Sequence, residues 1–425
     1  MIKRRQLLKH ATVGLAGLPI LGSTFALYGA RASAAEPESG STSADTPLGQ
    51  LERNKRVVRE QYEKAQEKVI PPTLPGAADF PRAEFAKDVP FVAMSCMDPP
   101  GGVDEPKAIA AAIAGWHAQS TAPAIHSYGP MIAEGNTVVE EWETFFHGLD
   151  GTMYSNHYCL LREIKDGQIA LVREYVDSHH AFIVLGLHAP WKALEPPHAP
   201  RRRLKRGQSN LNLPPLTEIE TVFPIRQEFE LKPSLLRDVT PTGNTPTRFP
   251  DTVEGNKALV RAMHDAQAKG DAAAVDSYHG RGFHHFIAGE GPLGWEHIPL
   301  QDLYAPLLKH LASPIKIRFG PLMSEDGRVF EEMDILAHLD DGSVYNNWHC
   351  LIHEIRGGQI VQTREYMDTH HLWVVLARWA DWGKTPVPPL RRARRSNMPY
   401  VTASYQARNP FLKLERWEPL PPVKT

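Results

Sequence analysis

The chain has 425 residues, of which 42% are hydrophobic, and its 47 basic side chains nearly balance 49 acidic ones. This length and hydrophobic content predict two or three domains with cores of their own and exclude a disordered chain. The near-neutral charge gives no electrostatic reason to expect a nucleic-acid partner. The three cysteines are odd in number and lack C-x-x-C spacing, which excludes a disulfide scaffold and a zinc ribbon.

The first 35 residues have the pattern of an export signal. Two adjacent arginines, Arg4 and Arg5, precede a mildly apolar run that ends in the small residues 32–34. A basic start, a short apolar stretch and an A-x-A end are typical of a cleavable signal, and the arginine pair resembles the twin-arginine type. An ordinary secretory signal or a retained anchor is the alternative. We expect a periplasmic or secreted bacterial protein that loses 1–35 and has a flexible start over 36–53.

The most informative feature is an internal repeat. Residues 151–180 and 342–371 align without a gap, and 16 of the 30 positions are identical. Self-similarity at a fixed offset, here 191 residues, indicates a tandem duplication. The predicted domains are a first repeat over 54–195, a Pro-rich connector with a basic run over 196–250, a second repeat over 251–383, and a Pro/Arg-rich extension over 384–425.

Within each repeat, helical patterns come first and strand patterns follow. Helical spacing of apolar residues covers 256–269, and further short helices are predicted at 303–311 and, in the first repeat, at 106–118. Glycine-containing turns then separate four predicted strands of the second repeat, at 315–323, 329–338, 343–355 and 359–375. Helices followed by an antiparallel meander predict an α+β fold in which helices pack on a curved sheet of four or more strands.

The strand pairs at 163–177 and 354–368 share the pattern E-I-x-x-G-Q-I-x-x-x-R-E-Y-x-D. With the preceding helices and meander, this pattern resembles the SnoaL-like polyketide cyclase branch of the nuclear-transport-factor-2-like superfamily, to which ketosteroid isomerases also belong. The resemblance implies two tandem cone-shaped domains, each with an apolar pocket, in a superfamily that includes isomerases, cyclases, dehydratases, hydrolases and binding modules. Related domains often dimerise through their sheet faces, so we expect the two repeats to form an internal pseudo-dimer.

Polar residues on the last strand of each repeat are the candidates for chemistry. A carboxylate beside His and Tyr on an apolar wall would have a raised pKa, and the Tyr or His could donate to a developing enolate. The resemblance adds that family members often place an Asp on this strand. The predicted catalytic residues are Asp368, His370, Tyr366, Asn347, His284, Arg364, Asp177 and His179. The alternative is structural: Arg364 and Asp368 could form ion pairs that tie the sheet or an interface together.

The His-rich segment around His284 and His285 exists only in the second repeat, so we expect that repeat to be the active one if only one is. Adjacent His residues on a strand face opposite ways, so spacing does not require a metal site, and no cofactor is predicted. Cys159 and Cys350 hold equivalent strand positions and are expected to be buried small residues rather than nucleophiles.

The predicted function is cofactor-free acid/base catalysis. The reaction would be an isomerisation, dehydration or cyclisation of a small apolar carbonyl or hydroxyl compound. The alternative is a periplasmic ligand-binding or accessory module without turnover.

Overall fold

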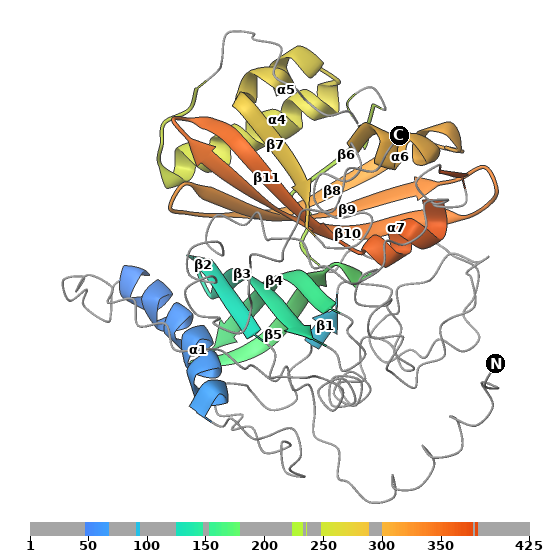
Figure 1. Ribbon diagram of the computed structural model, residues 1–425. Helices are drawn as coiled ribbons and strands as arrows, with labels where there is room; N and C mark the ends of the chain where they lie inside the picture. Colours follow the sequence, from blue (N-terminus) through green and yellow to red (C-terminus); the bar gives the residue numbers. More distant parts are fainter. Residues whose placement is uncertain are drawn as a thin grey trace, which may run out of the picture.

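A computed structural model of the chain describes residues 47–67, 91–93, 125–147, 153–178, 223–232, 235, 248–288, 300–376 and 379–380. They form an α+β structure with two mainly antiparallel sheets and few helices (Figure 1), which confirms the α+β part of the expected fold class. The helices among these residues include none that is both long and apolar enough to cross a membrane. The predicted segments 1–35, 106–118, 196–222 and 384–425 lie outside the described residues.

The first sheet comes from the first repeat and has the strand order β1-β5-β4-β3-β2. Its strands are β1 (Phe91–Ala93), β2 (Ile125–Glu134), β3 (Thr137–His147), β4 (Met153–Lys165) and β5 (Gln168–Val176). Helix α1 (Pro47–Glu67) precedes them. Neighbouring strands are antiparallel except β1 and β5, which run parallel. The β4–β5 turn places Asp166 and Gly167 at positive φ, 51° and 73°, as a tight hairpin requires.

The second sheet has the strand order β6-β8-β9-β10-β11-β7. Its strands are β6 (Gln227–Leu231), β7 (His279–Ile287), β8 (Ile315–Glu325), β9 (Arg328–His338), β10 (Val344–Arg356) and β11 (Gln359–Met367). Strands β11 and β7 form its one parallel pair. The edge strand β6 comes from the stretch predicted as a connector, so part of that stretch belongs to the second sheet.

Four helices belong to the second repeat: α4 (Val253–Lys269), α5 (Ala272–Tyr278), α6 (Leu300–Lys309) and α7 (Thr369–Leu376). Thr252 caps α4 by accepting a hydrogen bond from the Gly255 N–H at 3.1 Å, and Gly270 ends it at a φ of 71°. The prediction of one strand over 359–375 was wrong beyond Met367. Strand β11 stops there because Asp368 caps α7, its Oδ1 accepting from the His371 N–H at 2.9 Å.

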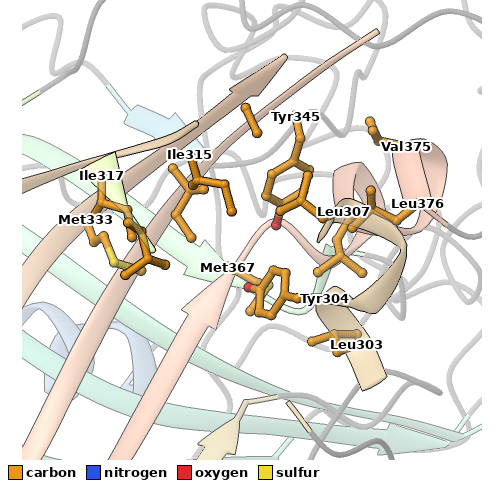
Figure 2. Close-up of a cluster of buried hydrophobic side chains, with 14 of the residues drawn as sticks. Leu303, Tyr304, Leu307, Ile315, Ile317, Met333, Tyr345, Met367, Val375 and Leu376 are labelled. Carbon is orange, nitrogen blue, oxygen red and sulfur yellow. The ribbon is translucent and has the colours of Figure 1, made fainter. Parts of the chain in front are cut away.

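The second sheet lies between the first sheet and helices of its own repeat (Figure 1), with β2 beside β8 and β5 beside β11. On the helix side, buried apolar residues of β8–β11 pack against α6 and α7. Figure 2 shows Leu303, Tyr304 and Leu307 of α6 close to Tyr345 and Met367 of the sheet. We call the side of the second sheet that packs against these helices the helix face, and the side toward the first sheet the repeat face.

Candidate functional site

The repeat face carries charged contacts that join the two repeats. Each repeat contributes an arginine, a tyrosine and a glutamate at equivalent positions: Arg173, Tyr175 and Glu141 from the first, Arg364, Tyr366 and Glu332 from the second. Arg364 donates from Nε and Nη2 to the Glu141 carboxylate, at 2.6 Å each, and Tyr366 donates to the same group at 2.6 Å. Arg173 and Tyr175 bind Glu332 in the same way, at 2.6–2.9 Å.

All six of these side chains are buried. Burial lowers the pKa of an arginine, but Glu141 raises that of Arg364 well above its usual value, and Glu332 raises that of Arg173. Cys159 and Cys350 contact each other inside this network, where burial raises the pKa of both thiols. The Arg and Tyr residues of the predicted catalytic set are thus engaged between the repeats instead of lining an apolar wall.

The predicted Asp residues also lie where the repeats meet. Asp177 and Asp368 form an antiparallel backbone bridge. The Ser178 hydroxyl donates to Asp368 Oδ1 at 2.6 Å, and the Thr369 hydroxyl donates to Asp177 Oδ1 at 2.5 Å. Asn347 binds the backbone N–H and C=O of Asp368, at 3.2 and 3.1 Å. These contacts differ from the expected acid/base set because each carboxylate already serves a cap or an inter-repeat hydrogen bond.

The predicted histidines are spread apart. His284 is exposed on β7 and its ring stacks on Phe286, with centroids 5.7 Å apart. His370 is in α7, and not on a strand as expected. His179 lies outside the described residues. The structure therefore does not bring His284 to Asp368, and the neighbouring His285 takes part in a different cluster.

That cluster is a buried carboxylate between two imidazoles on the helix face. Glu365 Oε1 lies 2.6 Å from His349 Nδ1, and Glu365 Oε2 lies 2.7 Å from His285 Nε2. Glu365 and His349 are buried, and His285 is partly buried. Burial alone would raise the pKa of Glu365, but the hydrogen bonds from His285 and His349 hold it well below its usual value. Glu365 is therefore an ionised acceptor, and each histidine donates to it.

The second ring nitrogen of His349 is the distinctive atom of the site. Because Nδ1 donates to Glu365, Nε2 of a neutral ring carries a lone pair. This Nε2 is buried and has no hydrogen-bond partner among the residues that the structure describes. A carboxylate–imidazole pair with an open Nε2 is the arrangement of a general base, since the carboxylate fixes the ring and stabilises the imidazolium that forms.

Hydroxyl donors stand near this base. Met367 lies directly opposite His349 in the β10–β11 register, and the Tyr304 hydroxyl is 3.9 Å from Met367 Sδ. Tyr304 and Tyr345 hydrogen-bond to each other, and the amide of Asn347 donates to the Tyr345 hydroxyl at 2.9 Å. Burial raises the pKa of both tyrosines, so both stay protonated. The site thus combines a base with neutral hydrogen-bond donors.

A second carboxylate on the helix face lies between two histidines and an arginine. Glu331 Oε1 lies 3.0 Å from Nε2 of both His264 and His353, and Oε2 lies 3.4 Å from Arg226 Nη2. Burial would raise the pKa of Glu331, but these histidines lower it to about 2. His264 also accepts from Arg226 and stacks on Phe319, with centroids 3.7 Å apart. This cluster links α4 and the segment before β6 to the sheet and therefore has a structural role.

Among the residues that the structure describes, no three His, Cys, Asp or Glu side chains are arranged to hold a metal ion.

The first repeat has the same backbone positions with different side chains. By strand register, Tyr158 replaces His349, Phe91 replaces His285, and Glu174 is the counterpart of Glu365. Glu174 is 5% exposed, and burial raises its pKa to about 8, only partly offset by Arg162. The first repeat therefore has a carboxyl group at this position but no histidine base beside it.

The predicted catalytic residues do not include His349, His285 or Glu365. His349 shares a face of its strand with Tyr345 and the predicted Asn347, as strand alternation indicates. The predicted His284 and the clustered His285 lie on opposite faces of β7, because adjacent strand residues point in opposite directions. Glu365 gave no separate signal, since glutamate recurs at the same place in the first repeat without the histidines.

The solved structures similar to this chain include nuclear-transport-factor-2-like and SnoaL-like proteins. One is a protein of this kind, of unknown function, from Burkholderia pseudomallei, at 16% identity and a TM-score of 0.25, covering 31% of this chain and 97% of that chain. A second, from Jannaschia, is named for its similarity to the SnoaL-like polyketide cyclases, at 16% identity and a TM-score of 0.24, covering 34% and 97%. A third is an epoxide hydrolase-like protein from Mycobacterium tuberculosis, at 16% identity and a TM-score of 0.22, covering 33% and 93%. No protein-family model and no curated protein matches the chain.

Proposed function

We propose that the second repeat is a cofactor-free acid/base enzyme acting on a small, largely apolar carbonyl or hydroxyl compound, with His349 as the proton-transfer base. The carrying observation is the buried Nε2 of His349, which has no partner while Nδ1 is fixed by Glu365 at 2.6 Å. Isomerisation, dehydration and cyclisation all need one proton taken from carbon or oxygen and one returned, which a single oriented imidazole performs.

In the proposed reaction, His349 Nε2 removes a proton from the carbon next to a carbonyl. Glu365 stabilises the resulting imidazolium across the 2.6 Å hydrogen bond, and the second hydrogen bond, to His285, keeps the carboxylate oriented. We assign the enolate oxygen to the Tyr304 hydroxyl, a neutral donor that contacts Met367 Sδ in this structure. Met367 has an unbranched, flexible side chain that can move to admit a substrate between donor and base.

The apolar surroundings favour this chemistry and select the substrate. Leu351 and Met367 flank His349 on the helix face, and Leu303 and Leu307 face them from α6. A charged substrate would lose its hydration here without a compensating partner, since Glu365 is already satisfied by two histidines. The proposal therefore favours an uncharged compound with one or two oxygen atoms.

We assign the first repeat the role of an internal partner subunit. Its Arg173–Glu332 and Glu141–Arg364 contacts are related by the offset of the duplication and cover the repeat face. In this proposal the chain is a pseudo-dimer whose halves differ in chemistry, and the twin-arginine pattern would carry it across the membrane already folded.

The alternative, a non-catalytic ligand-binding or accessory module, is favoured by a different observation. The predicted catalytic residues Asp368, Arg364 and Tyr366 are all used in inter-repeat or capping contacts. If His349 transfers no proton, the architecture that the two repeats share would serve assembly or ligand storage.

A proton-exchange experiment distinguishes the proposed enzyme from the binding module. The purified chain, without residues 1–35, would be incubated in D₂O with a panel of cyclic ketones, and exchange at the carbon next to the carbonyl followed by NMR. We expect exchange in the wild type and a loss of roughly 10²–10⁴-fold in His349→Ala. His285→Ala should lower the rate less, because Glu365 keeps its contact with His349.

His284→Ala is the matched control, since this exposed histidine neighbours His285 on the same strand. It should leave the exchange rate unchanged. Circular dichroism and gel filtration would verify that each variant is folded. Exchange that persists in His349→Ala, or that is lost in His284→Ala, would contradict the assignment, and wild-type protein without exchange on any ketone would support the binding module.

A further inference from the structure

A second, chemically different site is suggested by Glu174 in the first repeat. Its Oε2 is buried and has no hydrogen-bond partner within the described part of the chain, and the residue is only 5% exposed. A buried carboxyl oxygen without a partner is costly, so proteins satisfy such atoms with another residue, a water or a ligand. In the equivalent Glu365, both carboxylate oxygens have hydrogen-bond partners, because each contacts a histidine.

The surroundings of Glu174 are apolar and aromatic. By strand register, Leu160 lies beside Glu174, and Tyr158 beside Val176, on the same side of the sheet. The Tyr158 ring packs against Trp142 with centroids 5.0 Å apart. The nearest positive group that acts on Glu174 is Arg162, which lies 3.3 Å from Glu140 and is thus already paired. This environment keeps the Glu174 carboxyl protonated at neutral pH.

We propose that Glu174 is the polar anchor of a ligand-binding site in the first repeat for an uncharged, largely apolar compound with one carbonyl or hydroxyl oxygen. A protonated carboxyl can donate its O–H to a carbonyl and accept from a hydroxyl, while aromatic and aliphatic neighbours contact the rest of the ligand. An anion is disfavoured because Arg162, the cation among the described residues that acts on Glu174, is already paired with Glu140. Since Tyr158 stands in place of His349, the site binds without proton transfer. This inference does not rest on the function proposed for the second repeat.

Three probes of nearly equal shape test the proposed ligand class: acetophenone, ethylbenzene and benzoate. They share a benzene ring but carry a ketone, no oxygen and a carboxylate. Dissociation constants would be measured by saturation-transfer NMR at pH 6.5 in His349→Ala protein, so that the second repeat takes no part in turnover. We expect acetophenone to bind at least tenfold more tightly than ethylbenzene, and benzoate not to compete.

Two substitutions assign the binding to Glu174. Glu174→Leu keeps the apolar character and removes the donor, so it should weaken acetophenone binding at least tenfold while leaving ethylbenzene within about threefold. Glu174→Gln keeps a donor and should stay within about threefold of the parent for acetophenone. A ¹³C shift of the Glu174 carboxyl on adding acetophenone would report direct contact.

Equal acetophenone binding in the Glu174→Leu and parent proteins would overturn the proposal, as would no binding of acetophenone at millimolar concentration. In the second case Glu174 is satisfied by water alone. Neither result bears on His349, because ketone exchange in the wild type reports that site separately.

Discussion

Each repeat has a glutamate, a leucine and a second glutamate opposite one another on three neighbouring strands. The ionisation of the second glutamate differs between the two repeats. In the first repeat Glu140, Leu160 and Glu174 lie opposite one another on β3, β4 and β5, and in the second Glu331, Leu351 and Glu365 do so on β9, β10 and β11. The pKa of Glu174 is raised to about 8 by burial, whereas that of Glu365 is lowered because two histidine contacts outweigh burial. The same carboxyl is thus a neutral donor in one repeat and a fixed anion in the other.

The opposite faces of the two sheets have not diverged in this way. Arg, Tyr and Glu occur at matched positions, and each repeat donates to the glutamate of the other at 2.6–2.9 Å. The contact between the repeats therefore uses matched residues on one face of each sheet, whereas the faces that carry Glu174 and Glu365 differ in their charged and histidine side chains.

Removing either inter-repeat arginine should have the largest effect. Arg364→Ala leaves Glu141 as an uncompensated buried charge, and Arg173→Ala does the same to Glu332, so each should lower the free energy of unfolding by about 3–5 kcal/mol. Urea unfolding at pH 7 would measure both. The pair Arg364→Met with Glu141→Leu removes both charges and should cost much less than Arg364→Ala alone. Unequal costs for the two alanine variants, by more than about 2 kcal/mol, would show that the contact is not symmetric.

The divergent faces should respond to pH in opposite directions. The folded pKa of Glu174 lies above its unfolded value of about 4.3, so its ionisation destabilises the fold as pH rises from about 4 to 8. Relative to the wild type, Glu174→Gln should therefore become more stable by about 3 kcal/mol between pH 4 and pH 7, at about 1.4 kcal/mol per pH unit.

Glu365 is the matched comparison for that measurement. Its folded pKa is lowered, so its contribution is present above about pH 4.3 and is lost as pH falls below that value. Glu365→Gln should therefore be destabilised at pH 7, with a difference from the wild type that shrinks in acid. Thermal unfolding would measure this for Glu174→Gln between pH 4 and pH 8, and for Glu365→Gln between pH 2 and pH 7. Parallel pH profiles for the two variants would contradict the opposite pKa shifts of Glu174 and Glu365.

Much of this arrangement follows from sequence, because periodicity and repetition are local signals. The hairpin turns at Asp166–Gly167 and Asp326–Gly327 were predicted from dipeptides that tolerate positive φ, and both are found at φ of 49–73°. The end of β11 was not predicted because Asp368 fits the alternation of the strand. Its role as a helix cap depends on the helix that follows, α7. The edge strand β6 was missed because a strand in a proline-rich stretch is recognisable only by its pairing with β8.

The candidate site was harder to predict than the fold. Alternation shows that Arg364 and Glu365 face opposite ways, but not which side meets the other repeat and which meets the helices. That choice decides whether Asp368 or Glu365 is available to a substrate. His349 and His285 are 64 positions apart in the chain. The antiparallel pairing of β10 with β11 and the parallel pairing of β7 with β11 together bring them to one carboxylate.

The smallest predicted effect concerns two lysines that repeat the symmetry at the edge of the contact. Lys257 binds Glu134 of the first repeat, and Lys55 binds Glu325 of the second. Because one partner is partly exposed in each pair, either alanine substitution should cost only about 0.5–1 kcal/mol, and less in high salt. The Glu325 side chain is 20% exposed and that of Glu134 is 41%, so water screens the Lys257 pair more. Lys55→Ala should thus cost more than Lys257→Ala in urea unfolding. Methionine at each position is the control, since it keeps the apolar stem and isolates the charge. The reverse order would mean that packing of the stems, and not exposure of the carboxylates, sets the difference between these two contacts.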